Sequence, residues 1–141
     1  MSIRLTELTE SEIKDFMHFL NITPNHNFLY GKKKNSSTKK LLWFITSNPI
    51  WTVLTEVSYV VVFDNNSLYL KKAFTSLFFG KFEISTDINI LSLSDITAFS
   101  LSSNDKQIFL DLETVDKTYS FYFYNHRFNQ TNYKALKKIY G

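Results

Sequence analysis

The C-terminal part of the sequence constrains the fold most strongly, because it alternates like a series of strands and then changes to a helical period. The segment 89–141 contains INILSLSDITAFSL, QIFLDLE and TYSFYFY, with polar residues before each new segment, and closes with TNYKALKKIY. Alternation of apolar and polar residues with a period of two is typical of strands with one buried face. An antiparallel meander cannot bury that face alone, so we expect the closing amphipathic helix to cover it.

The residues before this segment add further strand signals. Residues 57–63 are apolar at both alternating sets of positions, which predicts a central strand, and residues 64–67, DNNS, predict a turn after it. The apolar phase changes at Asp95, where we expect a bulge or corner. Residues 41–45 are expected to form either a strand or the lead-in to one that begins at Trp51.

A helix is expected at each end of the chain. Near the start, Thr9 and Glu12 match a capping box, and near the end Asn129 or Thr131 is placed to cap the closing helix. Apolar residues recur at helical spacing in both segments. The expected stripes are Ile13, Phe16, Met17 and Leu20 in the first helix and Tyr133, Leu136, Ile139 and Tyr140 in the last.

The composition fits one globular domain without covalent staples. The chain has 141 residues, of which 44% are hydrophobic and 21% charged, and its fourteen Phe and eight Tyr suit the half-buried surfaces of sheets. Cysteine is absent, so disulfides and thiolate metal sites are excluded, and a reducing compartment is allowed. The first residues lack the apolar core of a secretory signal, and polar residues interrupt the apolar tract 41–63. We therefore expect a cytoplasmic protein.

The order of strands and helix resembles the pleckstrin-homology-like (PH-like) superfold, in its GRAM and bacterial PH variants. The resemblance rests on SLSDITAFSL preceding two hairpinned strands, and on the apolar pattern of IFLDLE, TYSFYF and YKALKKIY. Ile96 occupies the place of the isoleucine that follows a short polar step near the middle of the sheet in those families. The resemblance implies a mainly β (α+β) fold, a seven-stranded antiparallel roll or barrel capped by a C-terminal helix. It also implies a binding module, without assigning any site.

We divide the chain into an N-terminal helical extension with a basic linker, residues 1–40, and a PH-like β-barrel domain with its C-terminal helix, residues 41–141. The linker, GKKKNSSTKK at 31–40, has no hydrophobic periodicity and is expected to form a loop. It does not match a phosphate-binding P-loop, because that motif needs a second glycine directly before the Lys-Ser/Thr pair.

No motif in the sequence indicates catalysis or a metal site. His18, His26 and His126 lack the spacing of a helical metal pair and have no cysteine partner. Asp111 and Glu113 share a strand face, as paired catalytic carboxylates can, but the alternation of that strand places both on the solvent side. We expect no enzyme, no cofactor and no metal; a small enzyme that uses His126 is the weakest of the alternatives.

The basic residues carry the main functional indication. The formal net charge is +3, and lysines crowd the linker and one strand end. Lysines near an anionic lipid surface contribute about 1 kcal/mol each, although they lack the bidentate fork of arginine. The same lysines can instead keep the protein soluble and protect edge strands. The candidate binding residues are Lys32, Lys33, Lys34, Lys39, Lys40, Lys71 and Lys72.

The sequence therefore predicts a non-catalytic PH-like binding module. In the first hypothesis its partner is another protein, met through a sheet edge or through an outward aromatic patch that includes Phe109, Tyr122 and Tyr124. In the alternative it binds an anionic ligand, a membrane surface or nucleic acid, through the lysine-rich loops. The oligomeric state and the docking of the N-terminal helix stay open.

Overall fold

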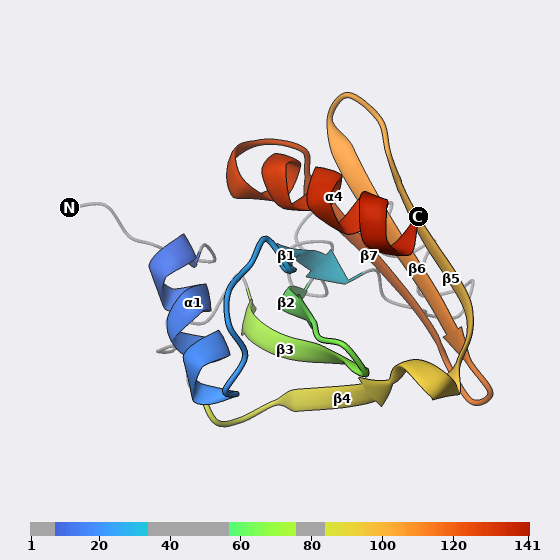
Figure 1. The fold of residues 1–141 in the computed structure, drawn as a ribbon, viewed down its shortest axis with the longest axis horizontal. Helices are drawn as coiled ribbons and strands as arrows, with labels where there is room; N and C mark the ends of the chain where they lie inside the picture. Colours follow the sequence, from blue (N-terminus) through green and yellow to red (C-terminus); the bar gives the residue numbers. More distant parts are fainter. Residues whose placement is uncertain (1–7, 34–56, 76–83) are drawn as a thin grey trace.

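The protein is seen in a computed structural model that describes residues 8–33, 57–75 and 84–141 (Figure 1). These residues form a mainly β fold with a helix at each end, as expected from the sequence. The strands expected at 41–45 and from Trp51 lie outside the described residues. The elements are α1 (Glu10–Phe19), β1 (Phe28–Lys33), β2 (Val57–Phe63), β3 (Ser67–Thr75), β4 (Ile88–Ser92), the 3₁₀ turn η1 (Leu93–Asp95), β5 (Ile96–Ser103), β6 (Gln107–Thr114), β7 (Thr118–Tyr124) and α4 (Arg127–Tyr140).

The strands form one antiparallel sheet in the order β4-β3-β2-β1-β7-β6-β5. β1 pairs with β2 along its whole length, but it pairs with β7 only at Lys32 and Lys33. This short pairing joins a first half, β1 to β4, to a second half, β5 to β7. The turn η1 carries the chain from β4 at one edge to β5 at the other, which confirms the corner expected at Asp95.

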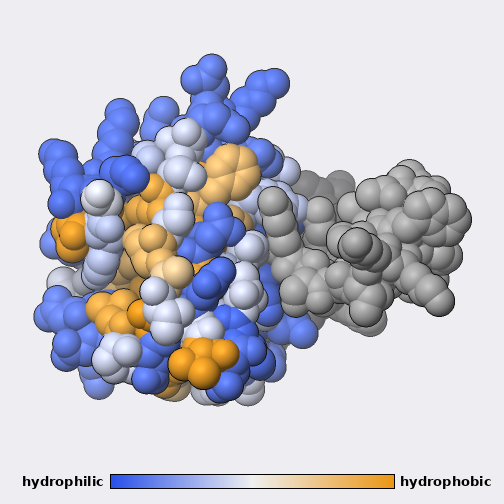
Figure 2. Space-filling model, turned by 90° about the vertical axis from the view of Figure 1, so that its right-hand side faces the viewer, coloured by the Kyte–Doolittle hydropathy of each residue, from blue (hydrophilic) through white to orange (hydrophobic). Residues whose placement is uncertain are grey.

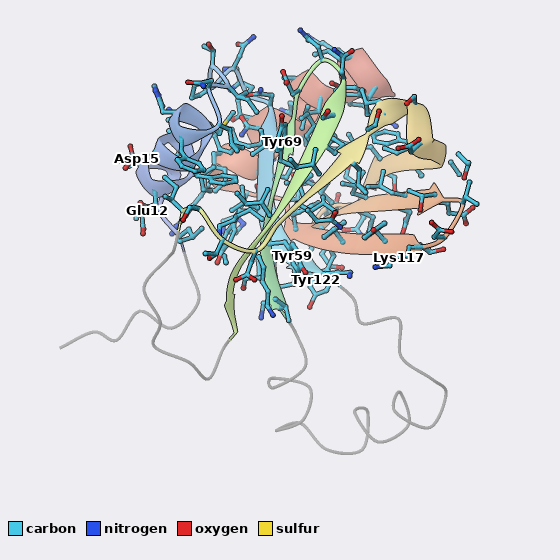
Figure 3. The ribbon with its side chains drawn as sticks, turned by 90° about the horizontal axis from the view of Figure 1, so that it is seen from below. Glu12, Asp15, Tyr59, Tyr69, Lys117 and Tyr122 are labelled. Atoms are coloured by element: carbon cyan, nitrogen blue, oxygen red, sulfur yellow. The ribbon has the colours of Figure 1, made fainter. Side chains whose placement is uncertain are left out.

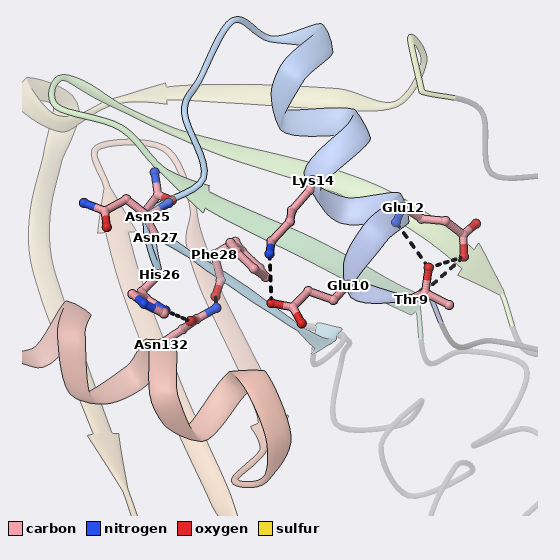
Figure 4. A network of polar contacts seen from close by, with 9 residues as sticks. All are labelled: Thr9, Glu10, Glu12, Lys14, Asn25, His26, Asn27, Phe28 and Asn132. Atoms are coloured by element: carbon pink, nitrogen blue, oxygen red, sulfur yellow. Dashed lines mark hydrogen bonds and ion pairs between the residues drawn. The ribbon is translucent and has the colours of Figure 1, made fainter.

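β2 is covered on both faces, as predicted for a central strand. Val61 and Phe63 lie in a core that both halves of the sheet share, and Tyr59 packs against it. Val60 and Val62 lie in a second core on the opposite face. That second core is built with Ile13, Phe16 and Met17 of α1, so the N-terminal helix docks on the outer face of the first half. The expected capping box of Thr9 and Glu12 is present (Figure 4).

The segment Gly31–Lys40 was expected to be a loop, and this expectation is wrong for its first three residues. Residues 31–33 belong to β1, next to the junction of the two halves, and residues 34–40 lie outside the described residues. β1 begins with the buried Phe28 and Leu29, whose apolar side chains face the two different cores. Pairing with two strands that are distant in the sequence therefore outweighs the polar character of the GKK end.

Gly31 lies where β1 passes closest to β7. A Cβ atom at this position would stand 2.8 Å from the Cα of Phe123 and would also collide with the Tyr122 carbonyl oxygen. Real Cβ atoms do not approach backbone this closely, so only glycine fits here. The β1–β7 junction depends on this missing side chain.

The closing helix α4 begins at Arg127, so neither Asn129 nor Thr131 caps it and that expectation is wrong. Leu136 is 1% exposed in the shared core, as expected, whereas Ile139 is 72% exposed and does not belong to the docking stripe. The last turn docks instead through Tyr140, whose ring packs against Phe63 and Phe99. Successive residues of a helix are rotated by about 100° about its axis, so when Tyr140 faces the core its neighbour Ile139 faces solvent.

Two buried asparagines fasten α4 to β1. Asn129 accepts a hydrogen bond from the Tyr30 N–H (3.0 Å) and donates to the Tyr30 carbonyl oxygen (2.8 Å) and to the Tyr124 carbonyl oxygen (3.2 Å). Asn132 donates to the Phe28 carbonyl oxygen (2.9 Å), and its own Oδ1 lies 3.0 Å from Nδ1 of His26 (Figure 4). These side chains satisfy the backbone groups of β1 where β7 does not pair with it.

Candidate functional site

The predicted lysines that lie among the described residues do not form one cationic surface. Lys32 and Lys33 are consecutive in β1 and therefore point to opposite faces of the sheet. Lys71 is 1% exposed, and its amine donates to the Thr86 carbonyl oxygen, so it is not available to a ligand on the surface. Lys72 is exposed on β3. Lys34, Lys39 and Lys40 lie outside the described residues.

Lys33 is held by two aromatic rings. Its Nζ lies 5.2 Å from the ring centroid of Tyr119 and 5.9 Å from that of Tyr59, distances typical of cation–π contacts. Burial lowers the pKa of Lys33, and the positive charge of Lys117 lowers it further. Figure 3 labels Tyr59 on β2 and Lys117 at the hairpin between β6 and β7. The amine of Lys33 therefore contributes to packing at the junction of the two halves.

Two half-buried tyrosines make the fold sensitive to alkaline pH. Burial raises the pKa of Tyr59, with smaller contributions from Asp87 and Tyr119, and burial followed by Asp64 raises the pKa of Tyr140. A raised pKa means that the unfolded chain ionises these phenols at a lower pH than the folded protein does.

We therefore expect the free energy of unfolding to fall as the pH rises through about 10, the ordinary value for tyrosine. Lys33 acts in the opposite sense, because its lowered pKa adds stability as the pH rises towards its ordinary value. Urea denaturation below and above this pH in the wild type and in the double variant Tyr59→Phe, Tyr140→Phe separates the two effects. An equal alkaline loss in both proteins would contradict the assignment to these tyrosines.

The outward aromatic patch is present but only partly accessible. Phe109 of β6 lies directly opposite Tyr122 of β7, and both rings are half-buried. Tyr124 is 54% exposed and packs edge-on against His126. The patch therefore offers one well-exposed ring and two half-buried ones.

The β5 strand forms one edge of the sheet, and none of the described strands pairs with its outer side. Its pairing pattern with β6 shows which backbone groups face outward. The Asn104 N–H donates to the Gln107 carbonyl oxygen (2.9 Å), so this is a hydrogen-bonded pair, and pairs alternate from there along the strands. The outward N–H and C=O groups therefore belong to Phe99, Leu101 and Ser103.

The side chains along this edge are uncharged. β5 reads ITAFSLSS, without the lysine, proline or inward-pointing charge that commonly protects an exposed edge strand. Figure 2, which looks onto this side of the molecule, shows apolar patches set among pale and hydrophilic residues. One charge reaches the edge from another element: Lys137 of α4 donates to the Leu101 carbonyl oxygen (2.6 Å). The remaining outward groups are chemically suited to pair with an extended chain.

Hydrogen exchange checks this register directly. In the free protein we expect the amides of Phe99 and Leu101 to exchange quickly and those of Ser100 and Ser102 to exchange slowly, because only the latter pair with β6. NMR-detected exchange measures each amide separately. The internal control is β6, which pairs on both sides and is expected to show no such alternation. Uniform protection along β5 would contradict an open edge.

The remaining candidate residues do not converge on a catalytic or metal site. Asp111 and Glu113 are exposed, as predicted from the alternation of their strand. In the described part of the chain, no group of three or more His, Asp or Glu side chains is arranged to hold a metal ion. No helix among the described residues has the length and apolar character needed to cross a membrane.

Sequence reasoning missed three residues of structural or chemical interest. Asn129 and Asn132 were not expected in the core, because no local signal shows that part of β1 lacks a strand partner. Arg127 was overlooked beside the more numerous lysines. No protein-family model, curated protein or solved structure matches this chain significantly.

Proposed function

We propose that this protein is a non-catalytic PH-like binding module that receives an extended segment of a partner protein along the β5 edge. The antiparallel strand order and the C-terminal helix support the PH-like part of the proposal. The absence of cysteine from the sequence supports a place in the cytoplasm. The observation that carries the binding proposal is the β5 edge, whose own side chains are uncharged. Its available outward backbone groups are those of Phe99 and Ser103 and the N–H of Leu101, since Lys137 occupies the Leu101 carbonyl oxygen.

Backbone groups on a sheet edge recognise another strand, because they offer N–H donors and C=O acceptors at the spacing of a strand. β5 has eight residues, whereas β4 at the opposite edge has five. The longer edge offers more hydrogen bonds to an incoming chain. Small side chains at Ala98, Ser100 and Ser102 leave room for the side chains of that chain.

Two variants of the edge test this proposal with a displayed library of short unstructured peptides. Ser102→Lys adds a protecting charge, and Ser103→Pro removes an outward N–H while leaving the β6 side of β5 intact. We expect each to weaken the binding of selected peptides about tenfold or more, the loss that follows when a buried backbone group stays unpaired. Thr23→Lys is the matched control, because it adds the same charge at an exposed position shortly after α1, and α1 lies on the opposite side of the molecule from β5 (Figure 1).

The location of the bound peptide is measured independently by hydrogen exchange. Bound peptide is expected to slow the exchange of the Phe99 amide, which faces outward in the free protein. Lys137→Met releases the Leu101 carbonyl oxygen and is expected to leave binding equal or tighter. Peptides that bind the edge variants as tightly as the wild type, with no change in exchange along β5, would refute the proposal.

The alternative of an anionic ligand on the lysine-rich loops receives less support from the described residues. Lys71 is buried and Lys33 is engaged by two tyrosine rings. It stays a prediction for Lys34, Lys39 and Lys40, whose replacement by serine should abolish salt-sensitive binding to anionic vesicles or DNA if those residues form the site.

A further inference from the structure

A cavity of about 210 Å³ lies between β1 and the start of α4. Tyr30, Lys32 and Ser58 border it from the first half of the sheet, and Tyr124 and Arg127 border it from the other side. It is separate from the β5 edge, which lies at the far end of the strand order. A ligand could therefore bind in this cavity whether or not a partner strand is bound at the β5 edge.

The described residues that line this cavity include cations but no carboxylate. Lys32 and Arg127 are positively charged and come from different elements, and His126 lies beside them. Positive charges that line a recess attract an anion and raise its local concentration. The guanidinium of Arg127 also provides a planar fork that matches carboxylate and phosphate oxygens.

Arg127 is fixed in an uncommon backbone conformation. Its φ is 54°, in the left-handed region that non-glycine residues seldom adopt. Such a conformation is unfavourable for a residue with a side chain and persists only where the surroundings hold it. Two residues later, Asn129 is fastened to the backbone of β1 and β7, which holds the start of α4 in place. The backbone of Arg127, at the border of the cavity, is therefore held in place by the hydrogen bonds of Asn129.

Part of the lining is apolar or aromatic, beside the polar side chains of Ser58 and Asn129. Leu8, Phe128 and the rings of Tyr30 and Tyr124 form walls that suit a flat apolar group. The amide of Asn129 is already engaged by backbone groups, so it serves as part of the frame. The volume admits a small molecule and excludes a folded partner.

We infer that this cavity binds a small planar organic anion, with its carboxylate or phosphate against Arg127 and its apolar body between Tyr30 and Tyr124. Lys32, which also lines the cavity, adds positive charge. The shared chemistry is a flat apolar body that carries one oxyanion group. The two possible head groups are separated by the choice of probe.

Four probes test the inference on the whole chain by ¹H–¹⁵N NMR titration: benzoate, phenyl phosphate, inorganic phosphate and benzyl alcohol. We expect saturable shifts of the Gly31, Lys32 and Asn129 amides with at least one of the two aromatic anions, and the tighter of them identifies the head group. Inorganic phosphate and benzyl alcohol should bind more weakly, since each lacks one half of the required chemistry. Inorganic phosphate that binds as tightly as phenyl phosphate, or no saturable shift with any probe, would overturn the inference.

A pair of charge-matched variants on one helix assigns the role of Arg127. Arg127→Gln is expected to weaken binding of the preferred anion about tenfold, as expected for one charge-assisted hydrogen bond. Lys138→Gln removes the same charge at the exposed far end of α4 and should leave binding unchanged. Equal effects of the two variants would reveal only non-specific attraction and would refute the site. Peptide binding at the β5 edge should survive Arg127→Gln, so a failure of either proposal is recognised separately.

Discussion

Replacing Gly31 by alanine is expected to lower the free energy of unfolding by about 3 kcal/mol, the upper end of the usual cost of overpacking. The added methyl group would meet the backbone of β7 at Tyr122 and Phe123, and backbone cannot rotate away as a flexible side chain can. Separating the strands to make room would break the pairing of Lys32 and Lys33 with β7. This pairing joins the two halves of the sheet, so the damage would not stay local.

Chemical denaturation followed by circular dichroism measures this loss. A domain of ordinary stability has about 5–15 kcal/mol in total, so a change of this size is easily resolved. Gly31→Val should destabilise more than Gly31→Ala, because it places more atoms against the same backbone. Thr118→Ala, at an exposed position of β7, serves as the control and should stay within about 0.5 kcal/mol of the wild type. A Gly31→Ala protein as stable as this control would show that β1 and β7 are not so close.

The second large effect is expected at Asn129. Replacing it by leucine keeps the branching and the number of side-chain heavy atoms but removes three hydrogen bonds to backbone groups of Tyr30 and Tyr124. Each buried backbone group left without a partner costs about 1–3 kcal/mol, although water entering from the neighbouring cavity can recover part of it. We expect a total loss of about 3 kcal/mol.

Comparison with neighbouring positions separates hydrogen bonding from packing. Gln130→Leu, the same kind of change at the adjacent exposed position, should have little effect. Asn132→Leu removes one donor to the Phe28 carbonyl oxygen and should cost less than Asn129→Leu. Exchange of the Tyr30 amide provides a local measure, since it should accelerate only when Asn129 is changed. Full stability of Asn129→Leu would mean that hydrophobic contacts alone hold α4.

The features that local patterns could predict are those whose cause lies within a few residues. The alternation of residues 57–63 identified the central strand β2, and the change of phase at Asp95 identified the corner at η1. The pairing of Thr9 with Glu12 identified the start of α1. In each of these cases the residues that make the decisive contacts, or that form the pattern, lie within a few positions of one another in the sequence.

The features that the patterns missed depend on residues far apart in the chain. Lys71 alternates with Leu70 and so points to the opposite face, where it is buried and its amine donates to the carbonyl oxygen of Thr86, fifteen residues further along the chain. Asn129 resembled a helix cap because no local signal shows that Tyr30 lies in the part of β1 that does not pair with β7. The cavity next to this unpaired part of β1 has no local signal either, so Arg127 at its border was not considered as a ligand-binding residue.

The arrangement of β1 has a consequence for biosynthesis. The Tyr30 N–H pairs with Asn129, which is 99 residues further along the chain. Until Asn129 has been synthesised and has docked, this side of β1 lacks those hydrogen bonds. Contacts of such long sequence separation form slowly, and an open strand side in a nascent chain is a point of misassembly. A polypeptide released early by the ribosome, before β7 and α4 have been translated, would carry this open side permanently and become a substrate for chaperones or proteases.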